Sequence, residues 1–161
     1  MEKIELVKEF MVKNNQITED FKINFDNIST KDLKNIKLRF ILYIEKLEEL
    51  LEVVFEEETI RNIKPFLNVI KNNINSLEAS SLDLDKKEIA RVITDIEYIN
   101  IGSALLFNIP LDQCFNIIHK NNLEKSDSFT GKPILREDGK VLYDSTHIPP
   151  NLESIFTDSS S

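Results

Sequence analysis

The stretch "LRFILYIEKLEELLEVV", residues 38–54, decides the fold of this chain. Its apolar residues recur at helical spacing, but they occupy more than one face of the helix that they predict. A helix that is apolar over so much of its circumference is typical of one that is covered on two sides. Ser29 and Thr30, which are residue types that cap helices, stand before the apolar run. The sequence therefore predicts a long helix that begins near residue 30 and is covered by other elements.

Apolar periodicity predicts further helices before and after this one. Pro65 stands near the start of the next predicted helix, where proline is tolerated. Asp83 or Asp85 can cap the helix after it, and Pro110 ends that helix. The predicted helices cover residues 2–13, 60–79, 88–107 and 111–122, with a loop over residues 14–30.

The chain changes character after Asn122. The segment "KPILREDGKVLYD", residues 132–144, has two short apolar runs on either side of Glu137-Asp138-Gly139, which predicts a hairpin. We therefore predict an all-α fold, a bundle of four to five helices with a hairpin-containing tail. The helical domain would span residues 1–122 and the tail, residues 123–161, would wrap it and end in disordered residues.

The composition and net charge of the chain limit the partners and the location that we expect. Asp and Glu number 28 against 20 Lys and Arg, which gives a net charge of −8 and a pI near 4.9. Such a chain repels phosphate backbones and anionic lipids, so we expect no nucleic-acid or membrane partner. The most apolar window, residues 99–110, is too short to span a bilayer, and Cys114 has no second cysteine to pair with. We expect a cytoplasmic protein.

Two helices carry acidic side chains at helical spacing. Glu45 and Glu49 share a face of the long helix, and Glu88, Arg91 and Asp95 form a stripe on another. Such charge runs normally indicate solvent exposure, but two acidic stripes that faced each other could also hold Mg²⁺ or Mn²⁺. Apolar residues on both sides of Asp95 favour a partly buried carboxylate, which needs a cation as its partner. Both interpretations stay open on spacing alone.

Several segments in order resemble the all-α nucleoside triphosphate pyrophosphohydrolase superfamily, which includes MazG, the dimeric dUTPases and phosphoribosyl-ATP pyrophosphohydrolase. The phosphoribosyl-ATP pyrophosphohydrolase-like branch is the most similar. The resemblance covers residues 38–152 except for residues 58–82, which look like an insertion. It is carried by "LRFILYIEKLEEL", "EIARVITDIEYINIGSALLFNIPLDQCFNIIHKNNLEK", "GKPILREDGKVLY" and "IPPNL".

The resemblance implies a Mg²⁺-dependent cleavage of a nucleotide between its α and β phosphates, with release of pyrophosphate. In this family a Glu-Glu-x-x-Glu motif on one helix and a Glu-x-x-Asp motif on the next, often with a further Asp one turn later, bind the metal. Glu45 and Glu49, as catalytic and metal-binding residues, match the first motif, and Glu88 and Asp95 match the second as metal ligands. Two cations depart from the pattern at ligand positions, namely Lys46 and Arg91. A shifted alignment that pairs Glu45 with Glu48 and Val92 with Asp95 fares no better, because valine cannot bind a metal.

These departures predict a weakened metal site, since an ammonium or guanidinium repels a divalent cation. Either the protein is a weakened pyrophosphohydrolase that uses Mg²⁺ or Mn²⁺, or it is an inactive family member that needs no metal. An inactive member would serve as a nucleotide-binding or protein-interaction dimer. The resemblance also implies a homodimer and a phosphate-binding tail, with the candidate substrate-binding residues Asn122, Lys125, Lys132 and Arg136 and, less strongly, Lys140.

Overall fold

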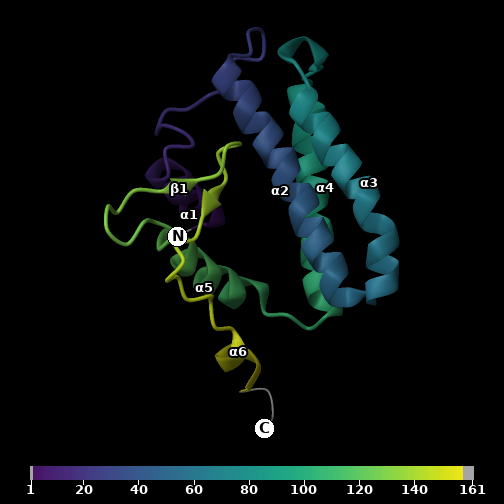
Figure 1. The fold of residues 1–161 in the computed structure, drawn as a ribbon, viewed down its shortest axis with the longest axis vertical. Coiled ribbons are helices and arrows are strands. Elements are labelled where there is room, and N and C mark those ends of the chain that lie inside the picture. Colours follow the sequence, from purple (N-terminus) through teal and green to yellow (C-terminus); the bar gives the residue numbers. More distant parts are fainter. Residues whose placement is uncertain (1, 158–161) are drawn as a thin grey trace. The chain divides into compact units, whose positions relative to one another are not determined.

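A computed structural model describes residues 2–157 and confirms the all-α class (Figure 1). The short sheet has only two strands. Of residues 157–161, which the sequence predicts to be disordered, Thr157 is the last residue of a short helix, Glu153–Thr157, and residues 158–161 lie outside the described part of the chain. The elements are α1 Lys3–Lys13, α2 Thr30–Val54, α3 Glu57–Ser76, a 3₁₀ turn Ala79–Ser81, α4 Lys86–Leu106, α5 Leu111–Leu123, β1 Ile134–Leu135, β2 Val141–Leu142 and α6 Glu153–Thr157.

Local capping explains where the two long acidic helices begin. The Ser29 hydroxyl accepts a hydrogen bond from the backbone N–H of Asp32, and the Asp32 carboxylate accepts one from the backbone N–H of Ser29. This reciprocal pair satisfies two backbone donors at the start of α2. At the start of α4 the Asp85 carboxylate accepts hydrogen bonds from the backbone N–H groups of Lys87 and Glu88.

Helix α3 begins earlier than the sequence predicted. It starts at Glu57, so that Pro65 lies inside the helix rather than near its start. The acidic residues Glu57 and Glu58 occupy its first turn, where negative charge stabilises a helix N-terminus. This local electrostatic signal explains the added residues at the start of the helix.

Packing divides the chain into two compact units. The first unit contains residues up to 21, residues 84–136 and residues from 141 onward. The second unit contains residues 22–83 together with residues 137–140, which form the tip of the hairpin. The predicted domain limits, 1–122 and 123–161, and the predicted insertion stay predictions.

The second unit is built on a pair of helices. Helices α2 and α3 pack side by side in opposite directions (Figure 1). Leu38 and Ile41 of α2 and Leu67 of α3 are its buried apolar residues. Gly139 has φ +96°, a conformation that L side chains rarely adopt, and it turns the hairpin tip against Leu38.

The first unit contains the packed helices α1 and α5 and the hairpin strands. A salt bridge of 2.7 Å joins Lys3 of α1 to Asp112 of α5, and Cys114 and His119 of α5 are buried. Strands β1 and β2 pair antiparallel with Ile134 opposite Leu142, which gives the predicted hairpin.

Within the described residues, no helix by itself has the length and apolar composition to cross a membrane. Helices α4 and α5 together would pass on length and composition alone, although they are bent by 111° at the break between them.

Candidate functional site

Three acidic side chains follow one side of helix α2. Glu45, Glu48 and Glu52 are separated by three and four residues, so successive turns of the helix place them in one stripe. The side chain of Glu48 is 11% exposed and that of Glu45 is 15% exposed. Carboxylates this far from water need a positive partner to stay charged.

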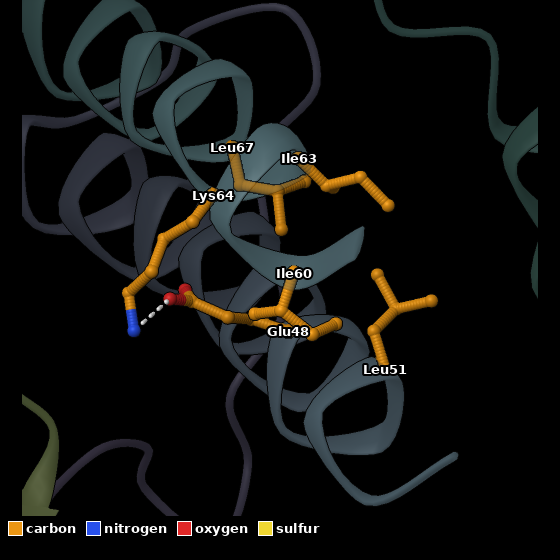
Figure 2. A pocket seen from close by; sticks show the side chains of 6 residues that line it. All are labelled: Glu48, Leu51, Ile60, Ile63, Lys64 and Leu67. Atoms are coloured by element: carbon orange, nitrogen blue, oxygen red, sulfur yellow. Dashed lines mark ion pairs between the residues drawn. The ribbon is translucent and has the colours of Figure 1, made fainter. Parts of the chain in front are cut away.

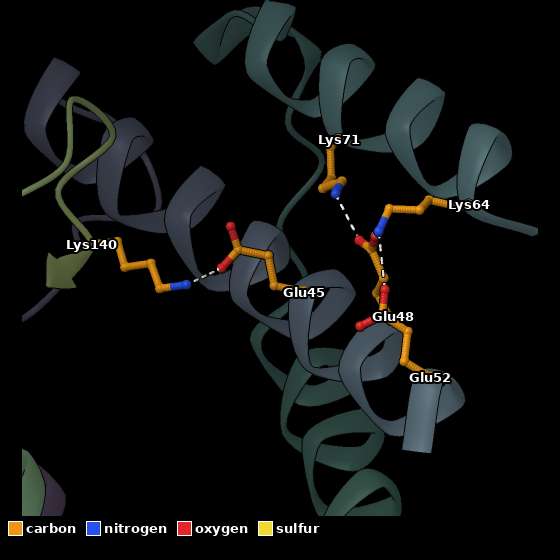
Figure 3. Close-up of polar contacts among 6 residues, drawn as sticks. All are labelled: Glu45, Glu48, Glu52, Lys64, Lys71 and Lys140. Carbon is orange, nitrogen blue, oxygen red and sulfur yellow. Dashed lines mark hydrogen bonds and ion pairs between the residues drawn. The ribbon is translucent and has the colours of Figure 1, made fainter. Parts of the chain in front are cut away.

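Two lysines of helix α3 form ion pairs with Glu48 (Figure 3). Lys71 Nζ lies 2.8 Å from Glu48 Oε2, and Lys64 Nζ lies 3.1 Å from Glu48 Oε1. The hydrogen bond from Lys71, followed by that from Lys64, holds the pKa of the Glu48 carboxyl below its usual value, although burial acts in the opposite direction. Glu48 is therefore ionised at neutral pH and bound on both of its oxygens.

Apolar side chains lie beside the Glu48–Lys64 ion pair. Glu48 and Lys64 line a shallow hollow between α2 and α3, and their charged ends point toward each other (Figure 2). Lys64 also binds Glu52, with Nζ 3.0 Å from Oε1. Apolar side chains that limit water around an ion pair strengthen its attraction. The other residues that line the hollow are Leu51, Ile60, Ile63 and Leu67.

Glu45 is bound from a different part of the chain. Lys140 Nζ, on the hairpin tip, lies 2.5 Å from Glu45 Oε2, and the Lys140 side chain is 25% exposed (Figure 3). Gly139 makes the turn that precedes this lysine. The sequence prediction placed Lys140 among the weaker phosphate ligands, whereas in the structure it binds a carboxylate.

Glu49, four residues after Glu45, lies beside this stripe on α2 but is exposed to water. Its carboxylate pairs with Lys46 at 2.5 Å, and both side chains are more than half exposed. An exposed pair of this kind contributes little stability. The two residues proposed as catalytic, Glu45 and Glu49, therefore bind different lysines, one partly buried and one in water.

On α4, in the first unit, Arg91 joins the two predicted ligands. Its Nε donates to Glu88 Oε2 at 3.0 Å and its Nη1 donates to Asp95 Oδ2 at 2.9 Å. One guanidinium thus pairs with both carboxylates and offsets half of their formal charge. All three side chains are about 61% exposed.

The predicted tail ligands fall into two groups. Asn122 accepts a hydrogen bond from the Tyr143 hydroxyl at 3.2 Å, and Lys125 Nζ lies 4.1 Å from the centre of the Tyr143 ring. The backbone carbonyl of Lys132 accepts from Asp127 N, and Arg136 directly follows β1. The structure therefore brings Asn122 and Lys125 together around one aromatic ring.

Sequence reasoning missed part of this arrangement. It did not use Glu48 with Glu52, although "EELLE" is an unbroken Glu-Glu-x-x-Glu, three residues after the register that was chosen. It also missed Lys64 and Lys71, whose separation of seven residues places them on the same side of α3. The spacing indicates that the two lysines share a face of α3, but nothing in the sequence indicates that this face meets α2.

A divalent cation needs several free oxygen ligands in a rigid frame. Within residues 2–157, no three His, Cys, Asp or Glu side chains gather as such a set. Instead, side-chain cations bind the carboxylates of α2 within the second unit and those of α4 within the first. As arranged in each unit, these acids fit side-chain cations rather than a divalent metal.

Comparison with known proteins places these helices in a family. A family model described as phosphoribosyl-ATP pyrophosphohydrolase matches residues 15–122, more than half of the chain. The matched range contains both acidic helices, α2 and α4, and all of α3. Comparisons with curated proteins and with solved structures found no match.

Proposed function

Because the chain belongs to the phosphoribosyl-ATP pyrophosphohydrolase family, we propose that it is a pyrophosphohydrolase-like protein that acts on a nucleoside triphosphate. In the proposed reaction one water is consumed and the anhydride bond between the α and β phosphates breaks. A nucleoside monophosphate and pyrophosphate are released. The observation that carries this proposal is the family match itself, which spans both helices that bear the candidate acids.

We propose further that the activity is weakened. The family reaction depends on Mg²⁺ or Mn²⁺, which would offset the negative charge of the phosphates when bound. Here Arg91 already pairs with both Glu88 and Asp95, and Lys46 pairs with Glu49. A divalent cation would have to displace these groups against their repulsion, which lowers its affinity.

Pyrophosphate release from a panel of nucleoside triphosphates with Mg²⁺ or Mn²⁺ tests both statements. The wild type is compared with Lys46→Glu/Arg91→Asp, which places an acid at the two positions where the predicted alignment departs from the family motifs. We expect slow release from the wild type and faster release from the double variant. Arg61→Asp, which reverses an exposed cation of α3, serves as the charge control and should leave the rate unchanged. A double variant no faster than the wild type would contradict the weakening by these two cations.

A second candidate function follows from the same ion pairs. If side-chain cations fully replace the metal, the protein is an inactive family member that binds a nucleotide or another protein. The two hydrogen bonds of Arg91, one to Glu88 and one to Asp95, favour this alternative. Nucleotide binding that persists in EDTA, without pyrophosphate release, would support it over the enzyme.

The exposed apolar side chains of α4 support a homodimer as part of this proposal. A helix with so many apolar residues in water is typical of an interaction surface. The exposed apolar residues of α4 are Ile89, Val92, Ile93, Tyr98, Ile99, Ile101, Leu105 and Leu106.

A cytoplasmic location also stays a proposal.

A further inference from the structure

We infer that the acidic stripe of α2 carries built-in counter-cations, supplied by Lys64 and Lys71 of α3 and by Lys140 of the hairpin tip. These lysines stand where a divalent cation would otherwise be needed. This inference deepens the proposed function, because it concerns the acids of one of the two family motifs. It differs from the effect of Lys46 and Arg91, since the three lysines come from outside the helices whose acids they bind.

The geometry separates Lys71 and Lys140 from ordinary surface charges, whereas Lys64 is half exposed. Lys71 and Lys140 are 21% and 25% exposed, and each carboxylate that they bind is 15% exposed or less. By contrast, both side chains of the Arg61–Glu57 pair on α3 are more than 70% exposed. Removing the partner of a partly buried carboxylate leaves a charge that water cannot fully solvate. Glu48 and Glu45 therefore require these cations or a substitute for them.

The charge and position of these carboxylates favour a divalent cation as the substitute for the lysines. Glu48 binds two ammonium groups, one on each oxygen, and Lys64 bridges Glu48 to Glu52. Two ammonium groups carry the same charge as one divalent ion beside the same carboxylates. A bound Mg²⁺ or Mn²⁺ would have to displace both lysines, and either one that stayed would repel it.

This inference gives the segment at residues 58–82 a role. Residues 57–76 form α3, which packs on α2 and brings both lysines to the acidic stripe. The segment therefore acts as the source of positive charge for α2. Lys140 does the same for Glu45 from the hairpin tip.

Mn²⁺ binding tests the inference without any measure of catalysis. It is measured as the loss of the electron paramagnetic resonance signal of the free ion. The variants are Lys64→Gln/Lys71→Gln and the same pair combined with Glu48→Gln. We expect the double variant to bind Mn²⁺ about tenfold more tightly than the wild type, because each ammonium removed takes away a repulsive charge. Adding Glu48→Gln should abolish that gain.

The matched control is Lys31→Gln/Arg61→Gln, which removes two cations from exposed positions of α2 and α3 outside the stripe. It should bind Mn²⁺ as the wild type does. Melting temperature gives a second readout, since Mn²⁺ should raise it in the lysine double variant and leave the wild type unchanged. If circular dichroism shows that the double variant does not fold, Lys71→Gln alone takes its place.

Two results would overturn the inference. The first is a folded lysine variant with no gain in Mn²⁺ binding. The second is wild-type binding that Glu48→Gln alone weakens, because Glu48 would then already hold a metal in the presence of its lysines. Pyrophosphate release by the wild type would leave the inference standing and would bear only on the proposed activity.

Discussion

Glu48 is a residue whose environment affects stability at low pH. The hydrogen bond from Lys71 places the pKa of its carboxyl below the ordinary value of 4.5 in the folded state. A carboxyl with a lowered folded pKa adds stability that is present above its unfolded pKa and is lost as the pH falls through the folded pKa. Wild-type stability should therefore fall as the pH drops below about 4.5.

Glu48→Gln removes that titration. We expect the variant to be about 1–2 kcal/mol less stable than the wild type at neutral pH, because the charged hydrogen bonds of Lys71 and Lys64 are weakened. Between about pH 5 and pH 3 its stability should change less than that of the wild type. Urea midpoints across this range measure both effects. Glu49→Gln is the control, since Glu49 pairs in water with Lys46 and should change little. Parallel pH curves for the wild type and Glu48→Gln would show that Glu48 is not held charged by the lysines.

At the scale of the element, the start of α2 depends on one side chain. The Ser29 hydroxyl accepts the backbone N–H of Asp32, and this helix carries every acid of the α2 stripe. Ser29→Ala should cost about 1 kcal/mol of unfolding free energy, because a helix N-terminal donor loses its acceptor. Thermal or urea unfolding measures the loss. Ser29→Asp, which keeps an acceptor oxygen, should retain nearly the wild-type value, and equal losses in both variants would exclude capping as the cause.

The helices could be predicted from the sequence because their signals are local. Ser29 and Asp32 are three residues apart, and Asp85 directly precedes α4. The lysine partners of the acids could not be predicted in the same way. Lys71 lies 23 residues from Glu48, and Lys140 lies 95 residues from Glu45. Only the packing of α3 on α2 and the turn of the hairpin bring those charges together.

At the scale of the whole molecule, both units carry large apolar side chains that are exposed to water. Val53 and Phe66 of the second unit are 85% and 72% exposed, and Tyr98 of the first is 81% exposed. Single exposed apolar residues are ordinary, but helices that carry several usually meet a partner. The apolar positions from which the sequence predicted helices covered on two sides are therefore partly exposed in the single chain, and a homodimer that would cover them stays a proposal.

The C-terminal end of α4 offers the sharpest test of that assembly. Leu105 and Leu106 are 76% and 80% exposed, so their replacement should hardly affect the stability of a single chain. If α4 lies in a homodimer interface, wild-type protein should have about twice the monomer mass of 18.7 kDa in light scattering. Leu105→Lys/Leu106→Lys should then shift it to the monomer, because buried lysines without partners oppose association. Phe129→Lys, at a position 96% exposed in a loop, should leave the mass unchanged. A wild type that is monomeric at high concentration, or a double variant that stays dimeric, would remove α4 from the interface and leave its apolar residues to a different partner.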